Sequence, residues 1–112
     1  MAGDKLMLST TFDVQGYRVT RYLGLVRGLT VRSPTIAQGI LGGLKSIVGG
    51  RIGAYTEMCE QARRDAATRM VDQAERLGAN AIIGVRYDAS EVAQGASEVL
   101  CYGTAVVIEP AA

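Results

Sequence analysis

A long apolar stripe with the period of an α-helix runs through the middle of this 112-residue chain. Apolar residues recur every three or four positions and the positions between them are charged, which is the pattern of an amphipathic helix. Acid-first pairs at i,i+4 spacing, such as Asp65 and Arg69, favour a solvent-exposed opposite face. Gly78 is placed to end the helix in a left-handed conformation. The sequence predicts a helix over residues 53–77, and its stripe consists of Tyr55, Cys59, Ala62, Ala66, Met70, Ala74 and Leu77, with Met58 at its edge.

Strand-like segments flank this helix on both sides. Residues 17–32 combine β-branched, aromatic and alternating polar residues, and residues 8–14 form a shorter candidate strand before them. Gly24 and Gly28 interrupt the longer segment, which indicates a bend, a bulge or the close approach of another backbone.

Two more candidate strands follow the helix, over residues 79–88 and 99–109. A polar connection joins them, with the tip of the hairpin near Gln94-Gly95. Strict alternation along the first of these strands predicts one face made of Ala81, Ile83, Val85 and Tyr87.

A shorter helix is predicted before the long one. Ser33 is a suitable N-cap, Pro34 suits the first helical position, and apolar residues follow at helical spacing until Gly49-Gly50. Within this segment, GILGGLKS at residues 39–46 approaches the phosphate-binding pattern G-x-x-x-x-G-K-[ST]. Leu44 stands where the second glycine is required, and the helix begins well before the lysine, so we interpret the match as coincidental.

The order of elements predicts a single α+β domain over residues 1–112. We expect a small two-layer sandwich, in which one long and one shorter helix pack on a mainly antiparallel, four-stranded sheet. The last strand carries apolar residues on both faces, whereas the helices can cover only one. A second partner for the sheet is therefore expected, and self-association is the simplest source of it.

Composition excludes several classes of function. With a net charge of +1, the chain lacks the excess of basic side chains that favours nucleic-acid binding. No apolar run approaches the ~18 residues of a membrane span, and the N-terminus does not resemble a secretory signal, so we expect a cytoplasmic protein. Histidine is absent and the two cysteines form no CxxC motif, which removes His-dependent catalysis and His-based zinc sites. We therefore expect that the protein is not an enzyme.

Several short motifs together resemble a known family. They are ST at 9–10, GG at 49–50, AYTE at 54–57, LGANAIIGVRYD at 77–88 and CYGTAVVIE at 101–109. In this combination the chain resembles the YbjQ-like family of small bacterial and archaeal proteins, over about residues 8–110. The resemblance implies an α+β subunit that closes into a ring, usually a homopentamer. It implies no activity, because the family is functionally uncharacterised, but its members carry the description "putative heavy-metal-binding".

One candidate ligand site lies before the long helix. A glycine-rich turn that opens a helix presents backbone N–H groups and the positive end of the helix dipole, which suits an anion. Tyr55 and Glu57 match the family motif there. The alternative is that the glycines only permit a tight turn and Tyr55 packs in the core. The candidate ligand-binding residues are Lys45, Gly49, Gly50, Arg51, Tyr55, Glu57 and, from the hairpin, Asp88.

Metal-ligating residues are few. Soft metals prefer thiolates and imidazoles, and this chain offers two separated cysteines. The carboxylates around the hairpin could bind a hard cation if several subunits contributed them. The alternatives are buried structural thiols and a solvated hairpin. The candidate metal ligands are Cys59, Cys101, Asp88, Glu91 and Glu98.

Three functions remain open at this point. The first is a non-enzymatic homo-oligomeric module, a pentameric ring that binds a small ligand, an ion or a protein. The second is heavy-metal binding or sensing, with a metal ion as the cofactor. The third is a small-molecule enzyme in which Tyr55, Glu57, Lys45 or Asp88 acts as acid or base, which requires a Glu57 that is shielded from water.

Overall fold

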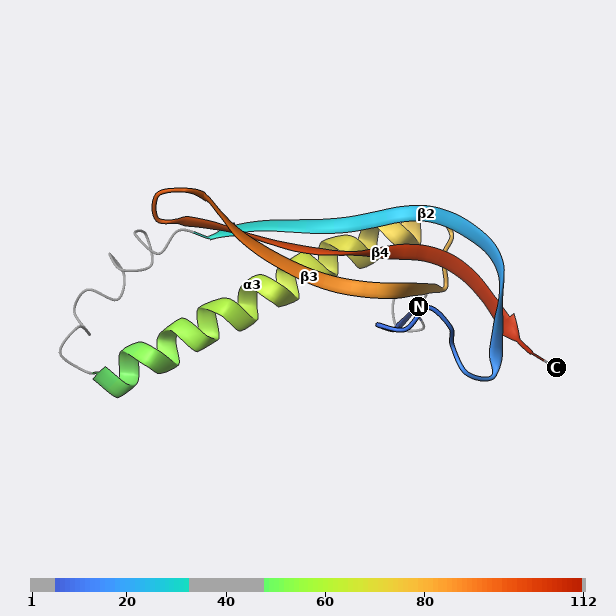
Figure 1. Cartoon of the computed structure of the whole chain (residues 1–112), viewed down its shortest axis with the longest axis horizontal. Helices are drawn as coiled ribbons and strands as arrows, with labels where there is room; N and C mark the ends of the chain where they lie inside the picture. Colours follow the sequence, from blue (N-terminus) through green and yellow to red (C-terminus); the bar gives the residue numbers. More distant parts are fainter. Residues whose placement is uncertain (1–5, 33–47, 112) are drawn as a thin grey trace.

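The computed structural model describes residues 6–32 and 48–111. These residues form an α+β structure, in which a long helix crosses one face of a four-stranded sheet (Figure 1). The strand order is β1-β3-β4-β2. The sheet is mixed, because β1 runs parallel to β3 while the other two pairings are antiparallel. In chain order the elements are β1 (Met7–Leu8), β2 (Tyr17–Arg32), α3 (Val48–Arg76), β3 (Ala81–Ala93) and β4 (Ala96–Pro110).

The element boundaries differ from the predicted ones in three places. The first strand is only Met7–Leu8, and residues 9–16 continue as an irregular segment. The long helix begins at Val48, so Gly49-Gly50 lie inside it and do not end a preceding helix. Strands β3 and β4 extend through the supposed polar connection to a tight turn, where Gly95 has φ +75°. The predicted shorter helix falls on residues outside the described part of the chain.

The core lies between α3 and the sheet. Ala62, Ala66, Met70 and Ala74 are buried as the stripe predicts. Two members of the stripe are wrong, since Cys59 is exposed and Leu77 is 47% exposed, while its first member, Tyr55, is half-buried. Leu77 follows the last helical residue, where the left-handed Gly78 turns the chain, and Cys59 lies in the half of α3 that diverges from the sheet (Figure 1).

Gly28 sets the closest approach between helix and sheet. A Cβ at this position would lie 1.8 Å from the carbonyl oxygen of Ala66 and 2.6 Å from the backbone nitrogen of Met70. The predicted close approach of another backbone is therefore confirmed at Gly28. At Gly24, φ is +111° and the register with β4 shifts, so the predicted bulge is confirmed there.

The other face of the sheet is covered at one end by the N-terminal segment. Ala81, Ile83, Val106 and Ile108 form a second buried cluster, against which Val14 and Val19 pack. This chain therefore supplies part of the cover that the sequence assigned to a partner.

A bulge in β3 overturns the predicted strict alternation. Gly84 has φ +63°, and the register with β4 shifts between Ile83 and Arg86. The shift turns Tyr87 toward α3, where it borders a depression with Ala67 and Val71. The extra residue of a bulge moves every later side chain of the strand to the opposite face of the sheet. A prediction from strict alternation cannot include this change.

Beyond the N-terminal segment, the outer face of the sheet exposes apolar side chains along β2. Leu25 is 67% exposed, Leu29 39% and Val31 54%. We call these three residues the open-face stripe. In the register, Leu29 lies directly opposite Leu100 of β4, so the apolar surface continues onto the neighbouring strand. β2 is also an edge strand of the sheet, 16 residues long.

Candidate functional site

The predicted anion site at the start of the long helix does not have the expected architecture. Gly49, Gly50 and Arg51 belong to the opening of α3 and not to a turn that precedes it. The side chain of Arg51, like all of Lys45, lies outside what the structure describes. The interpretation of the glycines as a turn between two helices is therefore wrong.

Tyr55 and Glu57 lie on α3 but do not share a pocket. Tyr55 is half-buried and borders a shallow depression, formed with Cys59, Glu60 and Arg63 on the same helix. The Glu57 side chain is 81% exposed, and its Oε1 lies 4.0 Å from Nη2 of Arg64. Water surrounds this carboxylate, so the structure provides none of the shielding that an acid–base role for Glu57 requires.

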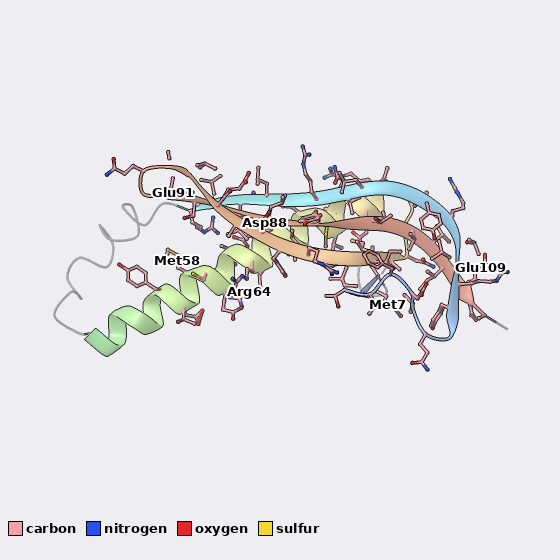
Figure 2. The ribbon with its side chains drawn as sticks, viewed as in Figure 1. Met7, Met58, Arg64, Asp88, Glu91 and Glu109 are labelled. Atoms are coloured by element: carbon pink, nitrogen blue, oxygen red, sulfur yellow. The ribbon has the colours of Figure 1, made fainter. Side chains whose placement is uncertain are left out.

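Asp88 is not brought to these helix residues. It lies opposite Leu100, on the sheet face that points away from α3. Its Oδ1 accepts a hydrogen bond from the N–H of Ala89 at 3.0 Å. Figure 2 shows Asp88 and Glu91 at separate points along β3, with Glu91 near the hairpin tip.

The other hairpin carboxylates also have local partners. Oε2 of Glu91 accepts a hydrogen bond from the N–H of Gly95 at 3.4 Å, and Oε1 of Glu98 accepts one from Oγ of Ser90 at 3.5 Å. No group of three or more acidic, Cys or His side chains converges within residues 6–32 and 48–111. A hard-cation site formed by one subunit is not present among these residues.

The two cysteines lie in different environments. Cys101 is buried in the core, where its thiol lies 3.7 Å from Sδ of Met70. Burial raises the pKa of the Cys101 thiol, which disfavours the thiolate that a soft metal needs. Cys59 is exposed on α3. The donor set described in one subunit does not fit a heavy-metal site, which would need further ligands from other subunits.

Thiol accessibility tests this placement. In the native protein we expect a neutral alkylating reagent to modify Cys59 and to leave Cys101 unmodified, because only Cys59 is exposed. Intact-mass spectrometry should show one adduct per chain under native conditions and two in urea. Rapid addition of a second native adduct would contradict the burial of Cys101.

A cavity that the sequence did not predict lies between α3 and the hairpin end of the sheet. Its volume is about 260 Å³. Arg32, the last residue of β2, lines it together with Met58 and Arg63 of α3 and Val99 of β4. No motif joins these residues, because they come from three elements that only the fold brings together.

Arg32 holds the helix and the sheet together beside this cavity. Its guanidinium forms an ion pair with Asp65. The Nε2 amide of Gln61 donates to Oδ1 of Asp65 at 2.9 Å, and this bond together with Arg32 lowers the pKa of the Asp65 carboxyl. The sequence predicted an i,i+4 pair of Asp65 with Arg69, whereas in the structure Asp65 forms its ion pair with Arg32 of β2.

The family motifs have structural roles in this fold. In the segment 77–88, Gly78 ends α3, Asn80 bonds to β4 and Gly84 forms the bulge. Arg86 anchors the N-terminal segment, since its Nη1 donates to the carbonyl oxygen of Thr10 at 2.8 Å and its guanidinium lies 5.8 Å from the centre of the Phe12 ring. These residues therefore explain the fold of the motif and do not by themselves indicate a catalytic site.

No helix among residues 48–76 is long and apolar enough to cross a membrane.

Comparison with known proteins places the chain in a family. A family model for YbjQ, described as "Putative heavy-metal-binding", matches residues 6–109. A UPF0145 protein of Legionella pneumophila subsp. pneumophila is 57% identical over 103 residues, which cover 92% of this chain and 98% of that protein. A UPF0145 protein of Burkholderia mallei is 52% identical over 103 residues, covering 92% and 93%.

A solved structure shares the fold. The crystal structure of a protein of unknown function from the DUF74 family of Pediococcus pentosaceus superposes with a TM-score of 0.62. The alignment covers 93% of this chain and 98% of that one at 20% identity, so it supports the fold alone. From the match over residues 6–109 and the identity to its relatives, the chain belongs to the YbjQ family of UPF0145 proteins.

Proposed function

We propose that this protein is a non-enzymatic homo-oligomeric module whose subunits associate through the outer face of the sheet. The observation that carries the proposal is the open-face stripe of Leu25, Leu29 and Val31 on a 16-residue edge strand. Arg27 interrupts the stripe on the same face, but exposed apolar side chains gathered on one sheet face favour an interaction site. A long edge strand with exposed apolar side chains is also prone to pair with another chain unless it is covered.

Self-association is the simplest way to cover this surface. A stable interface buries roughly 1,200–2,000 Å² in total, which needs more than three side chains. The stripe is continuous with Leu100 and the half-buried Tyr102 on β4, and Tyr22 on β2 adds an aromatic side chain that is 71% exposed. Five is the number of subunits that the family resemblance implies, and we propose it for this assembly.

Metal binding is the second candidate function, and the family description "Putative heavy-metal-binding" supports it. The donor set described in one subunit argues against it. If metal ligands come from several subunits, metal should raise the melting temperature of the assembled protein. No shift with zinc, copper, cadmium or nickel would exclude this function.

The introduction of negative charge into the stripe tests the proposed interface. We expect the double substitution Leu25→Glu and Leu29→Glu to give a monomer, because assembly would have to remove two carboxylates from water in place of two apolar side chains. Light scattering after size exclusion measures the mass. The matched control is Leu77→Glu, which places a carboxylate at a residue of comparable exposure (47%) beyond the end of α3. An oligomer that survives the double substitution would contradict this interface.

A further inference from the structure

The cavity between α3 and the hairpin has the character of a ligand pocket. It lies on the helix side of the sheet, opposite the open-face stripe. Most of its lining is apolar, and Figure 2 shows Met58 on the half of α3 that faces the hairpin end of the sheet. The side chains that form this apolar lining are Met58, Ala62, Ala89 and Val99.

Two guanidinium groups line this apolar cavity, and one of them, Arg63, can give it net positive charge. Arg32 is neutralised by its ion pair with Asp65. Within the described residues, Arg63 takes part in none of the ion pairs, which join Arg18 to Glu109, Arg32 to Asp65 and Arg64 to Glu57. No acidic side chain is among the residues that line the cavity. Glu60 borders the neighbouring depression with Arg63 but does not line this cavity. An anion in the cavity would therefore meet a guanidinium that is not engaged in any of these ion pairs.

The volume limits the size of an occupant. At the ~30 Å³ that a water molecule occupies in the liquid, about 260 Å³ holds roughly nine non-hydrogen atoms. This space matches a short hydrocarbon chain with one polar end.

We infer that this cavity binds a medium-chain carboxylate, with the carboxylate on Arg63 and the aliphatic tail against Met58, Ala62 and Val99. A guanidinium matches a carboxylate in charge and in bidentate geometry. The tail gains free energy from leaving water, in proportion to the apolar area that it buries. The inference goes beyond the proposed function and does not depend on it, because the cavity is lined by residues of one subunit.

Octanoate is the probe, and isothermal titration calorimetry of the full chain gives the affinity. For a ligand of this size we expect a dissociation constant of roughly 0.1–1 mM. Acetate supplies the charge without the tail, and 1-octanol supplies the tail without the charge. Both should bind at least about tenfold more weakly than octanoate. Equal binding of octanol and octanoate would overturn the role of Arg63.

Substitutions in the lining separate charge from space. Arg63→Gln should weaken octanoate binding about tenfold, the loss of one charge-assisted contact, and Arg63→Lys should restore part of it. Ala89→Leu should abolish binding, because the larger side chain at this exposed strand position occupies the cavity. The control is Arg76→Gln at the other end of α3, which should bind octanoate as the wild type does.

Cys59 provides a local readout because it lines the same cavity and is exposed. Bound octanoate should slow the alkylation of Cys59 by iodoacetamide, and Arg63→Gln should remove this protection. Heat of binding without protection of Cys59 would place octanoate elsewhere and overturn the inference. Absence of binding, together with protection of Cys59 that increases with protein concentration, would assign the cavity to a second copy of the chain and also overturn it.

Discussion

Gly28→Ala is expected to unfold this protein. The added methyl group would lie 1.8 Å from the carbonyl oxygen of Ala66 and 2.6 Å from the backbone nitrogen of Met70. Both are backbone atoms of α3, so no side-chain rotation can relieve the overlap. The helix must move off the sheet and open the core around Met70, and overpacking of this severity costs about 4 kcal/mol or more. Because total stability is typically about 5–15 kcal/mol, little folded protein should remain.

Circular dichroism during urea titration measures this effect, and Gly53→Ala is the matched control. Gly53 also lies in an element interior, in α3, but a Cβ there would meet nothing within 4 Å. Alanine at Gly53 should therefore raise the free energy of unfolding by up to ~1 kcal/mol through helix propensity. A Gly28→Ala protein that unfolds at the wild-type urea concentration would contradict the close packing described here.

Asn80→Ala has the second-largest expected effect on stability. Nδ2 of Asn80 donates to the carbonyl oxygen of Ile108 at 2.9 Å, and its Oδ1 accepts from the N–H of Ile108 at 2.8 Å. The side chain thus extends the pairing of β3 and β4 by one bridge and fixes the turn after α3. Loss of both bonds leaves a donor and an acceptor of Ile108 without partners, at a cost of about 2 kcal/mol.

The same urea titration serves for Asn80, with Gln73→Ala as the control. Gln73 also bonds to a backbone group, since its Oε1 accepts from the N–H of Arg27 at 2.7 Å. This single bond is exposed, so water can replace it and the expected loss is below ~1 kcal/mol. If both substitutions lowered the free energy of unfolding equally, the pair of hydrogen bonds between Asn80 and Ile108 would contribute no more than the single bond of Gln73.

The sequence predicted the parts of the fold that follow from period and local chemistry. The buried stripe from Ala62 to Ala74, the hairpin turn at Gly95, the positive φ at Gly24 and the close helix approach at Gly28 all have local signals. The sequence-based prediction was wrong where tertiary contacts determine which way a side chain faces or which surface is covered. The bulge at Gly84 reversed the facing of Tyr87, and the N-terminal segment covered a face that pattern alone left open.

The candidate site was less predictable than the fold. Tyr55, Glu57 and Asp88 were selected because they match motifs, yet the structure leaves Glu57 in water and puts Asp88 on the sheet face away from α3. The cavity residues Arg32 and Arg63 come from a strand end and a helix face that are far apart in sequence. Only the packing of α3 against β2 brings them together, so no spacing rule could identify them.

Native mass spectrometry of the untagged protein, without added metal, tests the central claim most directly. It counts subunits and weighs any species that they retain. We expect a closed homo-oligomer, and the family resemblance implies five subunits. The double substitution Leu25→Glu and Leu29→Glu should convert it to a monomer. A wild-type protein that is monomeric at micromolar concentration would contradict assembly through the open face of the sheet.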